Sequence, residues 1–432
     1  MNKLLVTAVA IGLAGMTGSA WAITDNEANA SLPFSFSNPG ARALGMGGAF
    51  LGLADDASAA YANPAGLTQL VSPEVSAELR SVSTNTRWLD GGTAQYNGFN
   101  SSGLNYSSQD DRTNSLRSFS FVYPGERMSF AIYRYEVINY DSDFQSAGAV
   151  TVTGDGSGYT GNVFAYDVNT SFGVDSYGVA MGFKASDRLS FGLGINYYLL
   201  DIRTTTDRFS PQDGSQLSRE ANLDGDGKVG FTLGARLVLT DWLSGGLSYR
   251  HAPSLDYDAV LSSPNFPGES IKLGTSLNVP DVFGIGLSVR PSDAWVINLD
   301  VSRVAYSQVT DNLVSLFDSD QASSLDPLKL DDGTEVRLGA EYTFATARPF
   351  SLRAGVWRDP AHELVYRGNP PNFDPATQNP EANAVTFSSG RKGSQTHYAI
   401  GAGMAFSKFQ IDIGADFSDT SDTVSASGVL RF

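Results

Sequence analysis

Apolar residues recur at every second position along many separate segments, and this period restricts the fold more than any other feature of the chain. The clearest case is 188–203, where the apolar positions are Leu189, Phe191, Leu193, Ile195, Tyr197 and Leu199. The positions between them are Ser190, Gly192, Gly194 and Asn196. A period of two places alternate side chains on opposite faces of a β-strand. The sequence therefore predicts a chain that is almost entirely β.

Fourteen segments carry this alternation or can form a strand beside those that do. We expect strands at 73–88, 116–123, 127–140, 171–185, 188–203, 229–239, 243–249, 283–289, 295–301, 336–344, 350–356, 398–406, 409–417 and 424–432. In a soluble sandwich the apolar faces would pack on each other. In a membrane barrel they would face lipid, and the polar faces would line the lumen.

The lengths of the connections favour the membrane barrel over the sandwich. Tight turns fall near 124, 186, 241, 291, 348 and 407, after every second strand. Long polar segments lie between them, at 90–113, 141–170, 204–227, 252–275, 310–332 and 360–393. Short turns on one side, long loops on the other and an even strand number are typical of outer-membrane barrels. We predict a 14-stranded antiparallel transmembrane β-barrel, residues 73–432, with both termini on the periplasmic side.

The N-terminus resembles a secretory signal peptide, which we place at residues 1–22. Lys3 supplies a positive charge, 4–16 is apolar, and Ala20-Trp21-Ala22 fits a cleavage site. After cleavage the chain would begin near Ile23 and reach the bacterial outer membrane. No later run approaches the roughly 18 apolar residues of a spanning helix. The net charge of −17 argues against a nucleic-acid partner.

Residue Phe432 continues the apolar face of the last predicted strand. We expect this strand to close the barrel against the first, and the barrel-assembly machinery to recognise Phe432. Outer-membrane lipid and lipopolysaccharide would surround the finished barrel.

Residues 23–72 show no period of two and carry many Ala and Gly residues. A fourteen-stranded lumen is too wide for its own wall side chains to fill. We therefore predict that this segment is a hatch that plugs the lumen, with short helices at 43–49 and 55–60 and a turn at 63–66. A disordered periplasmic tail is the alternative, which the Leu, Met, Phe and Tyr content of the segment disfavours.

The stretch GARALGMGGAFLGLADDASAAYANPAGLTQL (40–70) resembles the N-terminal hatch of the FadL/TodX (OMPP1) family of outer-membrane transporters. The segments 222–241, 279–309 and 335–360 are also similar to that family. The resemblance implies passive uptake of long-chain fatty acids or related hydrophobic molecules such as aromatic hydrocarbons. The ligand would be captured by extracellular loops and released past the hatch, through a lateral gap in the wall.

The resemblance also implies which hatch residues control passage. Asn63, Pro64 and Ala65 match the family's Asn-Pro-Ala element, which lies near a kink in the third strand. Together with them we expect gating roles for Gly66, Gly47 and Gly48. The third predicted strand, 127–140, departs from the family because it has no Gly or Pro to mark a kink, and Ile23-Thr24-Asp25 lacks the family's usual mature start.

Strand parity places four arginines on the lumen face, namely Arg236, Arg250, Arg337 and Arg353. Arginine binds carboxylates through two parallel hydrogen bonds, so each is a candidate contact for a fatty-acid head group. Parity also places four carboxylates inside, namely Asp300, Glu341, Asp412 and Asp416. The alternative is therefore a charge ladder within the wall.

The sequence contains no signal for an enzyme, a cofactor or a metal site. The segment 222–227 begins like a calcium loop, but its twelfth position is Leu233 instead of Glu. His251, His362 and His397 stand in no recognisable triad motif, although His397 at a strand end is the one candidate for a Ser/His pair. Besides the transporter, a secretion shuttle, scaffold or surface receptor remains open, because the connections are long and acidic.

Overall fold

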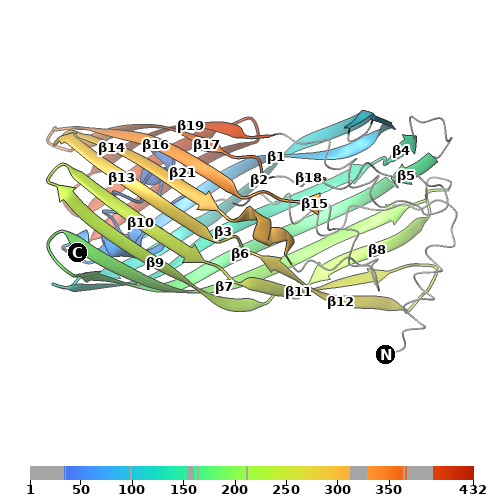
Figure 1. The fold of residues 1–432 in the computed structure, drawn as a ribbon, viewed down its shortest axis with the longest axis horizontal. Helices are drawn as coiled ribbons and strands as arrows, with labels where there is room; N and C mark the ends of the chain where they lie inside the picture. Colours follow the sequence, from blue (N-terminus) through green and yellow to red (C-terminus); the bar gives the residue numbers. More distant parts are fainter. Residues whose placement is uncertain are drawn as a thin grey trace.

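The computed structural model describes residue 34 and residues 36–97, 100–152, 160–163, 165–210, 213–311, 328–362, 365–366 and 393–432. Fourteen strands of this part form one closed barrel, in which every strand is antiparallel to both of its neighbours (Figure 1). They are β1 (Glu74–Asn97), β2 (Asn100–Tyr123), β3 (Met128–Ser146), β6 (Ala165–Lys184), β7 (Leu189–Phe209), β9 (Gly227–Thr240), β10 (Leu243–His251), β13 (Val282–Ser292), β14 (Trp295–Val304), β16 (Gly333–Phe344), β17 (Phe350–Asp359), β19 (Gln395–Ala405), β20 (Phe409–Phe417) and β21 (Ser421–Arg431). The predicted fold class is confirmed.

The last strand closes the barrel against the first, as the sequence predicts. β21 pairs with β1 from Thr84 opposite Ser421 down to Glu74 opposite Arg431. The Phe432 amide extends this ladder by donating to the Pro73 carbonyl at 3.1 Å. Closure leaves no free sheet edge over these residues, which a barrel in lipid requires because the bilayer core offers no water as a partner.

The alternation seen in the sequence becomes the difference between the two faces of the wall. On β7, Phe191, Leu193 and Ile195 are exposed on the outside, whereas Ser190 and Asn196 are buried on the inside. An apolar outer face and a small, polar inner face are the arrangement that a membrane barrel needs. None of the described helices is long and apolar enough to cross a membrane.

Several segments that we expected to be long loops are strands instead. Residues 90–113 lie in the hairpin of β1 and β2, which stay paired up to Asn97 opposite Asn100. The segments 141–170, 204–227 and 252–275 contain ends of β3, β6 and β7. They also contain all or most of five further strands, namely β4 (Ala149–Val152), β5 (Thr160–Val163), β8 (Gln216–Leu223), β11 (Ser254–Ser262) and β12 (Ser270–Asn278). These extensions project from the end of the barrel opposite the C-terminus (Figure 1). The pattern missed them because their outer face meets water, so it carries no apolar period.

The other two expected loops, 310–332 and 360–393, lie largely outside the described residues. Their described parts include the end of the 3-10 helix η2 (Tyr306–Thr310) and the two-stranded sheet of β15 (Leu328–Lys329) and β18 (Val365–Tyr366).

The N-terminal segment lies inside the barrel, near the end that holds the C-terminus (Figure 1). It contains α3 (Ala41–Gly45), α4 (Ala59–Ala62) and the 3-10 helix η1 (Pro64–Gln69). The predicted helix boundaries were wrong. α3 ends before Gly47 and Gly48, which take φ values of 65° and 78° that continue no right-handed helix. Asp56 accepts from the Ser58 amide at 2.9 Å, which makes a local turn where we expected the second helix to begin.

Candidate functional site

The inner wall carries a belt of glycines on which the backbone of the plug rests. A Cβ atom added at Gly246 would lie 2.0 Å from the Leu51 carbonyl oxygen, and one at Gly192 would lie 2.2 Å from the Ala65 amide nitrogen. Real Cβ atoms do not approach backbone so closely. The belt glycines that contact Leu51–Gly52 or Asn63–Leu67 are Gly182, Gly192, Gly234, Gly246 and Gly286. Those that contact Ala41–Gly47 are Gly339, Gly355, Gly401 and Gly414.

The strand register brings these glycines side by side. Gly192 is paired with Gly182 on one side and with Gly234 on the other, and Gly246 is paired with Gly286. Likewise Gly339 faces Gly355, and Gly401 faces Gly414. The wall therefore offers two flat strips on which another backbone can lie without intervening side chains.

Buried polar side chains of the wall then fix the plug backbone. Asp300 accepts from the amides of Phe50 and Leu51 at 2.6 and 2.8 Å. Glu78 accepts from the Gly40 amide at 2.7 Å. A buried carboxylate without hydrogen-bond donors is costly, and so is a buried amide without an acceptor. The wall carboxylates and the plug amides therefore stabilise each other.

The predicted hatch residues Asn63, Pro64, Ala65 and Gly66 lie together in this seat. The Asn63 amide nitrogen donates to the carbonyls of Leu51 and Ala235, each at 3.1 Å, so it joins two parts of the plug and the wall. Its amide oxygen accepts from the Ala65 amide at 3.3 Å and begins η1. Gly47 and Gly48 lie elsewhere, against β17 and the Arg337 side chain. The structure thus places the six predicted gating residues in two separate contacts with the wall.

Two of the four predicted lumen arginines have carboxylate partners in the wall itself. Arg353 contacts Glu341 at 2.6 Å and Asp412 at 2.8 Å. Arg337 contacts Glu335 at 2.9 Å and donates to the Gly47 carbonyl of the plug at 3.0 Å. These contacts agree with the charge-ladder alternative for both residues.

Arg42, which the sequence analysis missed, continues this ladder into the plug. It contacts Asp55 at 2.7 Å and Glu341 at 2.8 Å. Burial opposes its charge, but the carboxylates of Asp55, Glu341 and Asp56 outweigh burial and hold the pKa of Arg42 well above its usual value. For Asp56 burial dominates and raises the pKa of the carboxyl. The signal was present in the sequence, since Arg42 is the only basic residue between 38 and 67.

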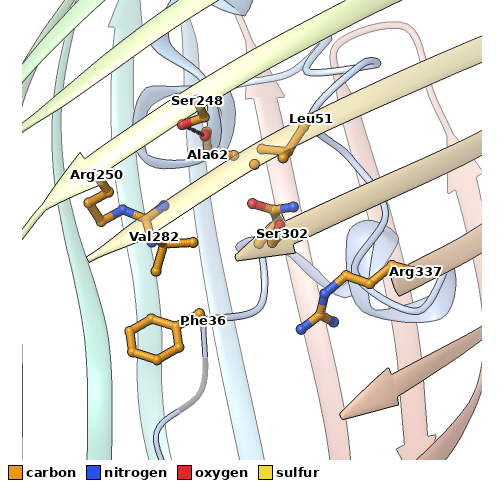
Figure 2. A pocket seen from close by; sticks show the side chains of 10 residues that line it. Phe36, Leu51, Ala62, Ser248, Arg250, Val282, Ser302 and Arg337 are labelled. Carbon is orange, nitrogen blue, oxygen red and sulfur yellow. Dashed lines mark hydrogen bonds between the residues drawn. The ribbon is translucent and has the colours of Figure 1, made fainter. Parts of the chain in front are cut away.

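Among the four predicted lumen arginines, Arg250 has two buried nitrogens without an acceptor, whereas Arg236 and Arg353 each have one. The Arg250 guanidinium lies 3.8 Å from the centre of the Tyr61 ring, and Nη2 donates to the Tyr61 carbonyl at 3.2 Å. Among the described residues no acceptor meets its Nε or Nη1. The side chain lines a cavity of about 20 Å³, with Arg337 on the far side and Phe36 between them (Figure 2). A space of this size holds about one water molecule. Arg236 is only half-buried and does not line this cavity.

Beyond the plug, the inner face of the wall changes from small and polar to large and apolar. On β7 the inward residues after Asn196 are Tyr198, Leu200 and Ile202, all buried. The same cluster includes Val137, Ile138, Phe172, Val174, Leu255, Tyr257, Leu277, Val279, Val304 and Tyr306. We call this apolar lining the vestibule. The sequence carried a signal for it, because Tyr197–Leu200 is apolar on both faces of the strand.

The wall is incomplete as a backbone ladder between β2 and β3. Within residues 100–152, the pairing of these strands is confined to Ser118–Tyr123 with Phe130–Tyr135. β3 then has an irregularity between Glu136 and Ile138, while it goes on pairing with β6. Residues 127–140 contain no Gly or Pro, as noted from the sequence, and β3 nevertheless carries this irregularity within a continuous strand. A β-bulge needs only one extra residue, here Val137, and no special residue type.

The described residues contain no group of three or more His, Asp or Glu side chains suited to a metal ion. In the calcium-like segment, Asp224 has a φ of 62° and Lys228 forms an ion pair with Asp256 at 2.6 Å. His397 is buried with Nδ1 2.6 Å from Asp416, and Trp357 stacks on its ring. This contact orients the histidine within the wall.

Comparison with known proteins agrees with this architecture. The family described as outer membrane protein transport protein (OMPP1/FadL/TodX) matches residues 23–363. The crystal structure of a Pseudomonas aeruginosa FadL homologue superposes with a TM-score of 0.61 at 15% identity, covering 92% of this chain and 99% of that chain. The toluene transporters TbuX of Ralstonia pickettii and TodX of P. putida have TM-scores of 0.55 and 0.54, both at 15% identity and with the same coverage. No curated protein sequence matches the chain.

The glycine belt can be tested with two neighbouring residues of β10. We expect Gly246→Ala to displace the plug backbone around Leu51 from the wall, because the new Cβ would lie 2.0 Å from the Leu51 carbonyl oxygen. Overpacking of this kind costs about 1–3 kcal/mol, and even one or two kcal/mol changes a two-state population by a factor of about 5–30. Amide hydrogen exchange over residues 46–53, with the protein in nanodiscs, measures the effect.

The matched control is Gly245→Ala, whose Cβ would lie at an ordinary 3.6 Å from the nearest Leu287 carbon. Heat-dependent gel mobility shows that both variants still form the barrel. Equal plug exchange in the two variants would show that the belt does not seat the plug.

Proposed function

The chain belongs to the OMPP1/FadL/TodX family of outer membrane transport proteins, and on this premise we propose that it is a passive channel for hydrophobic small molecules, in particular long-chain fatty acids. The ligand is captured among the extracellular segments, is held in the vestibule above the plug, and leaves past the hatch. The observation that carries the proposal is the vestibule itself. A water-filled porin has a polar interior, whereas this interior is apolar above a closed plug.

The apolar vestibule favours entry of a hydrophobic ligand. Burial of apolar surface is favourable by roughly 25 cal/mol per Å², so a long alkyl chain gains much by leaving water for this lining. Tyr198 and Leu200 are almost fully buried in this cluster, which strands from both halves of the chain share, so a ligand has to displace the groups that cover them. Water and ions gain nothing comparable from this lining.

Arg250 supports an acidic head group as the preferred partner at the floor of the vestibule. Its Nε and Nη1 groups have no acceptor among the described residues, and an unsatisfied buried donor costs about 1–3 kcal/mol. A carboxylate would satisfy both groups. The cavity of about 20 Å³ is too small for a head group, so binding requires Phe36 or the plug to move. Neutral aromatic hydrocarbons, the ligands named for the toluene transporters, would not use this contact.

Release past the plug follows from the same arrangement. We propose that Asn63–Gly66 and the Gly47-Gly48 pair control the path, since both groups contact the wall directly. The interrupted ladder between β2 and β3 supports a lateral exit from the vestibule. Export to the outer membrane would use residues 1–22 as a cleaved signal peptide.

Substrate choice is tested by uptake of radiolabelled oleate and of toluene in a deletion strain that carries each variant. We expect Arg250→Gln to lower oleate uptake by about tenfold, because a hydrogen bond to a charged group contributes about 1.5–3 kcal/mol. Toluene uptake should not change, and Arg250→Lys should recover part of the oleate uptake. Equal loss of both substrates would remove the carboxylate contact from the proposal.

The same strain separates transport from the alternative function as a secretion shuttle or surface receptor. If the complemented deletion strain takes up neither oleate nor toluene faster than the strain without the gene, the transporter proposal fails. A protein partner that copurifies with the barrel, with no lipid in its lumen, would instead support the alternative.

The hatch residues are tested by the double variant Asn63→Ala/Pro64→Ala, which makes the element Ala-Ala-Ala. It removes two hydrogen bonds of 3.1 Å that join the plug to itself and to β9. We expect a normally folded barrel with altered oleate uptake. Failure to fold would show that the element is structural, and wild-type uptake would remove it from the mechanism.

A further inference from the structure

The outer face of the barrel carries two exposed arginines at the extracellular edge of its apolar band. Arg303 lies near the end of β14, and Arg358 lies near the end of β17. Each arginine follows an outward-facing valine, Val301 or Val356, by two residues, so parity places both arginines on the lipid side of the wall. Both strands rise from periplasmic turns, so the arginines lie where the apolar face ends.

Below the arginines the wall is apolar on its outside, which fixes their level in the membrane. On the two strands that adjoin β17, Val336 of β16 is 42% exposed and Tyr398 of β19 is 64% exposed. An exposed tyrosine at the end of an apolar band is typical of the membrane–water interface of a barrel. The two arginines therefore lie at the level of the lipid head groups of the outer leaflet.

The strand register fixes the separation of the two arginines, because β16 lies between them (Figure 1). Arg303 is paired with Thr334, and Arg358 is paired with Val336, two residues along the same strand. With neighbouring strands about 4.8 Å apart and a rise of about 3.3 Å per residue, the two Cα atoms lie about 12 Å apart. Two extended arginine side chains can therefore meet at one anion between them.

Arg358 keeps most of its hydrogen-bonding capacity. Its Nη1 donates to the Thr396 hydroxyl at 2.7 Å, and within the described part of the chain it forms no ion pair with a carboxylate. Its Nε and Nη2 groups can thus form the two parallel hydrogen bonds that arginine makes with a phosphate. Other exposed basic residues of the extracellular segments differ, since Arg203, Arg219 and Lys272 pair with aspartates at 3.0, 2.6 and 2.7 Å.

Arg303 is oriented by contacts along the wall. Its Nη1 donates to the Thr334 hydroxyl at 3.0 Å, and its Nη2 lies 3.5 Å from Asp332 Oδ2. The other oxygen of Asp332 accepts from the Ser307 hydroxyl at 2.7 Å. Two arginines with one carboxylate leave a net positive charge at this place on the wall.

A positive site here is unusual for the chain as a whole, whose net charge is −17. Such a surface repels anionic lipid unless a local patch of opposite charge offsets it. The outer leaflet of a bacterial outer membrane consists of lipopolysaccharide, and its lipid A anchor carries phosphates directly above the acyl chains. Acyl chains on the apolar band would thus place a phosphate at the level of the arginines.

We propose that Arg303 and Arg358 form a binding site for a phosphate of lipid A on the outside of the barrel. Arg358 contacts the phosphate through Nε and Nη2, and Arg303 contacts it from the other side of β16. The lipid chains pack on the exposed apolar residues of β14, β16, β17 and β19 below. One lipopolysaccharide molecule is thereby held against this part of the wall.

Native mass spectrometry of the barrel in a mild detergent, titrated with purified lipid A, tests the site. We expect Arg358→Gln to weaken binding by about fivefold, since a basic residue near anionic lipid contributes about 1 kcal/mol. Arg303→Gln/Arg358→Gln should weaken it by about 25-fold. Arg358→Lys keeps the charge but not the two parallel hydrogen bonds, so its affinity should lie between those of Arg358→Gln and the wild type.

The matched control removes the same charge at the other end of the barrel. Arg127 and Arg188 are exposed on periplasmic turns, and Arg127→Gln/Arg188→Gln should bind lipid A as the wild type does. Heat-dependent gel mobility shows that each variant still forms the barrel. Wild-type affinity in Arg303→Gln/Arg358→Gln, or an equal loss in the periplasmic variant, would overturn the site.

Three further probes identify the group that is bound. Lipid A without its phosphates should bind the wild type and Arg303→Gln/Arg358→Gln equally, because the arginines then have no anion to contact. Phosphatidylglycerol should bind more weakly than lipid A, and millimolar inorganic phosphate should not displace lipid A. Displacement by inorganic phosphate, or equal binding of phosphatidylglycerol, would replace lipid A by a free anion or by any anionic lipid and so overturn the assignment.

The inference does not depend on the proposed function, because no transported substrate enters its tests. A barrel that binds lipid A through the two arginines but takes up neither oleate nor toluene keeps the site and removes the transporter. A barrel that takes up oleate while both arginine variants bind lipid A normally keeps the transporter and removes the site.

Discussion

The backbone-to-backbone contact between the plug and the glycine belt is the constraint on which the rest of the structure depends. Gly52, Gly286 and Gly246 show how close it is, since a Cβ at any of them would meet another backbone within 3 Å. Such a contact fixes the plug in one position, because sliding by one residue would bring a side chain against the belt. It also leaves only about 20 Å³ of cavity beside Arg250. The cavity beside Arg250 therefore has no room for a ligand until Phe36 or the plug moves.

The buried charges add specificity to this seat more than stability. The chain of contacts runs from Asp412 through Arg353, Glu341 and Arg42 to Asp55, with distances of 2.6–2.8 Å. Buried ion pairs often contribute little net stability, because desolvation offsets their attraction, but breaking one is costly. A plug in any other position would separate Arg42 from Glu341, and each would keep only its partner within the plug or within the wall, Asp55 or Arg353. The ladder therefore disfavours alternative seats.

The sequence predicted the barrel well because lipid imposes a regular pattern on it. Every spanning strand must present apolar residues outward, as β7 does, so strand number, order and closure could be deduced from alternation and turn spacing. Above the membrane the strands need no apolar outer face, so the outer part of the β1–β2 hairpin could not be distinguished from a loop. The predicted boundaries of the plug helices were wrong because the helix ends depend on the backbone conformation of Gly47 and Gly48 and on the Asp56 turn. These conformations form where the plug contacts the wall.

The candidate site was harder to predict, because the register of many strands decides which of its side chains meet. Parity placed Arg250 in the lumen, but nothing in the sequence distinguished it from Arg353, whose carboxylate partners come from β16 and β20. The early end of the β2–β3 ladder was missed for a similar reason. A bulge at Val137 requires no special residue, and the Glu136 contacts exist only because Ser115 and Arg117 face it from β2.

One sequence feature does distinguish β1, β2 and β3 from the rest of the wall, namely the distribution of glycine. Residues 74–90, 104–123 and 128–146, which make up most of β1, β2 and β3, contain no glycine. The plug cannot lie backbone to backbone on this sector, and it meets side chains there instead, such as Ser120, which donates to the Ala57 carbonyl at 2.9 Å, and Glu78. Side-chain contacts can break and re-form by rotamer changes, whereas the belt cannot give way without moving a backbone. The backbone contacts on the belt strands and the side-chain contacts on β1 and β2 are therefore two consequences of where glycine occurs in the wall.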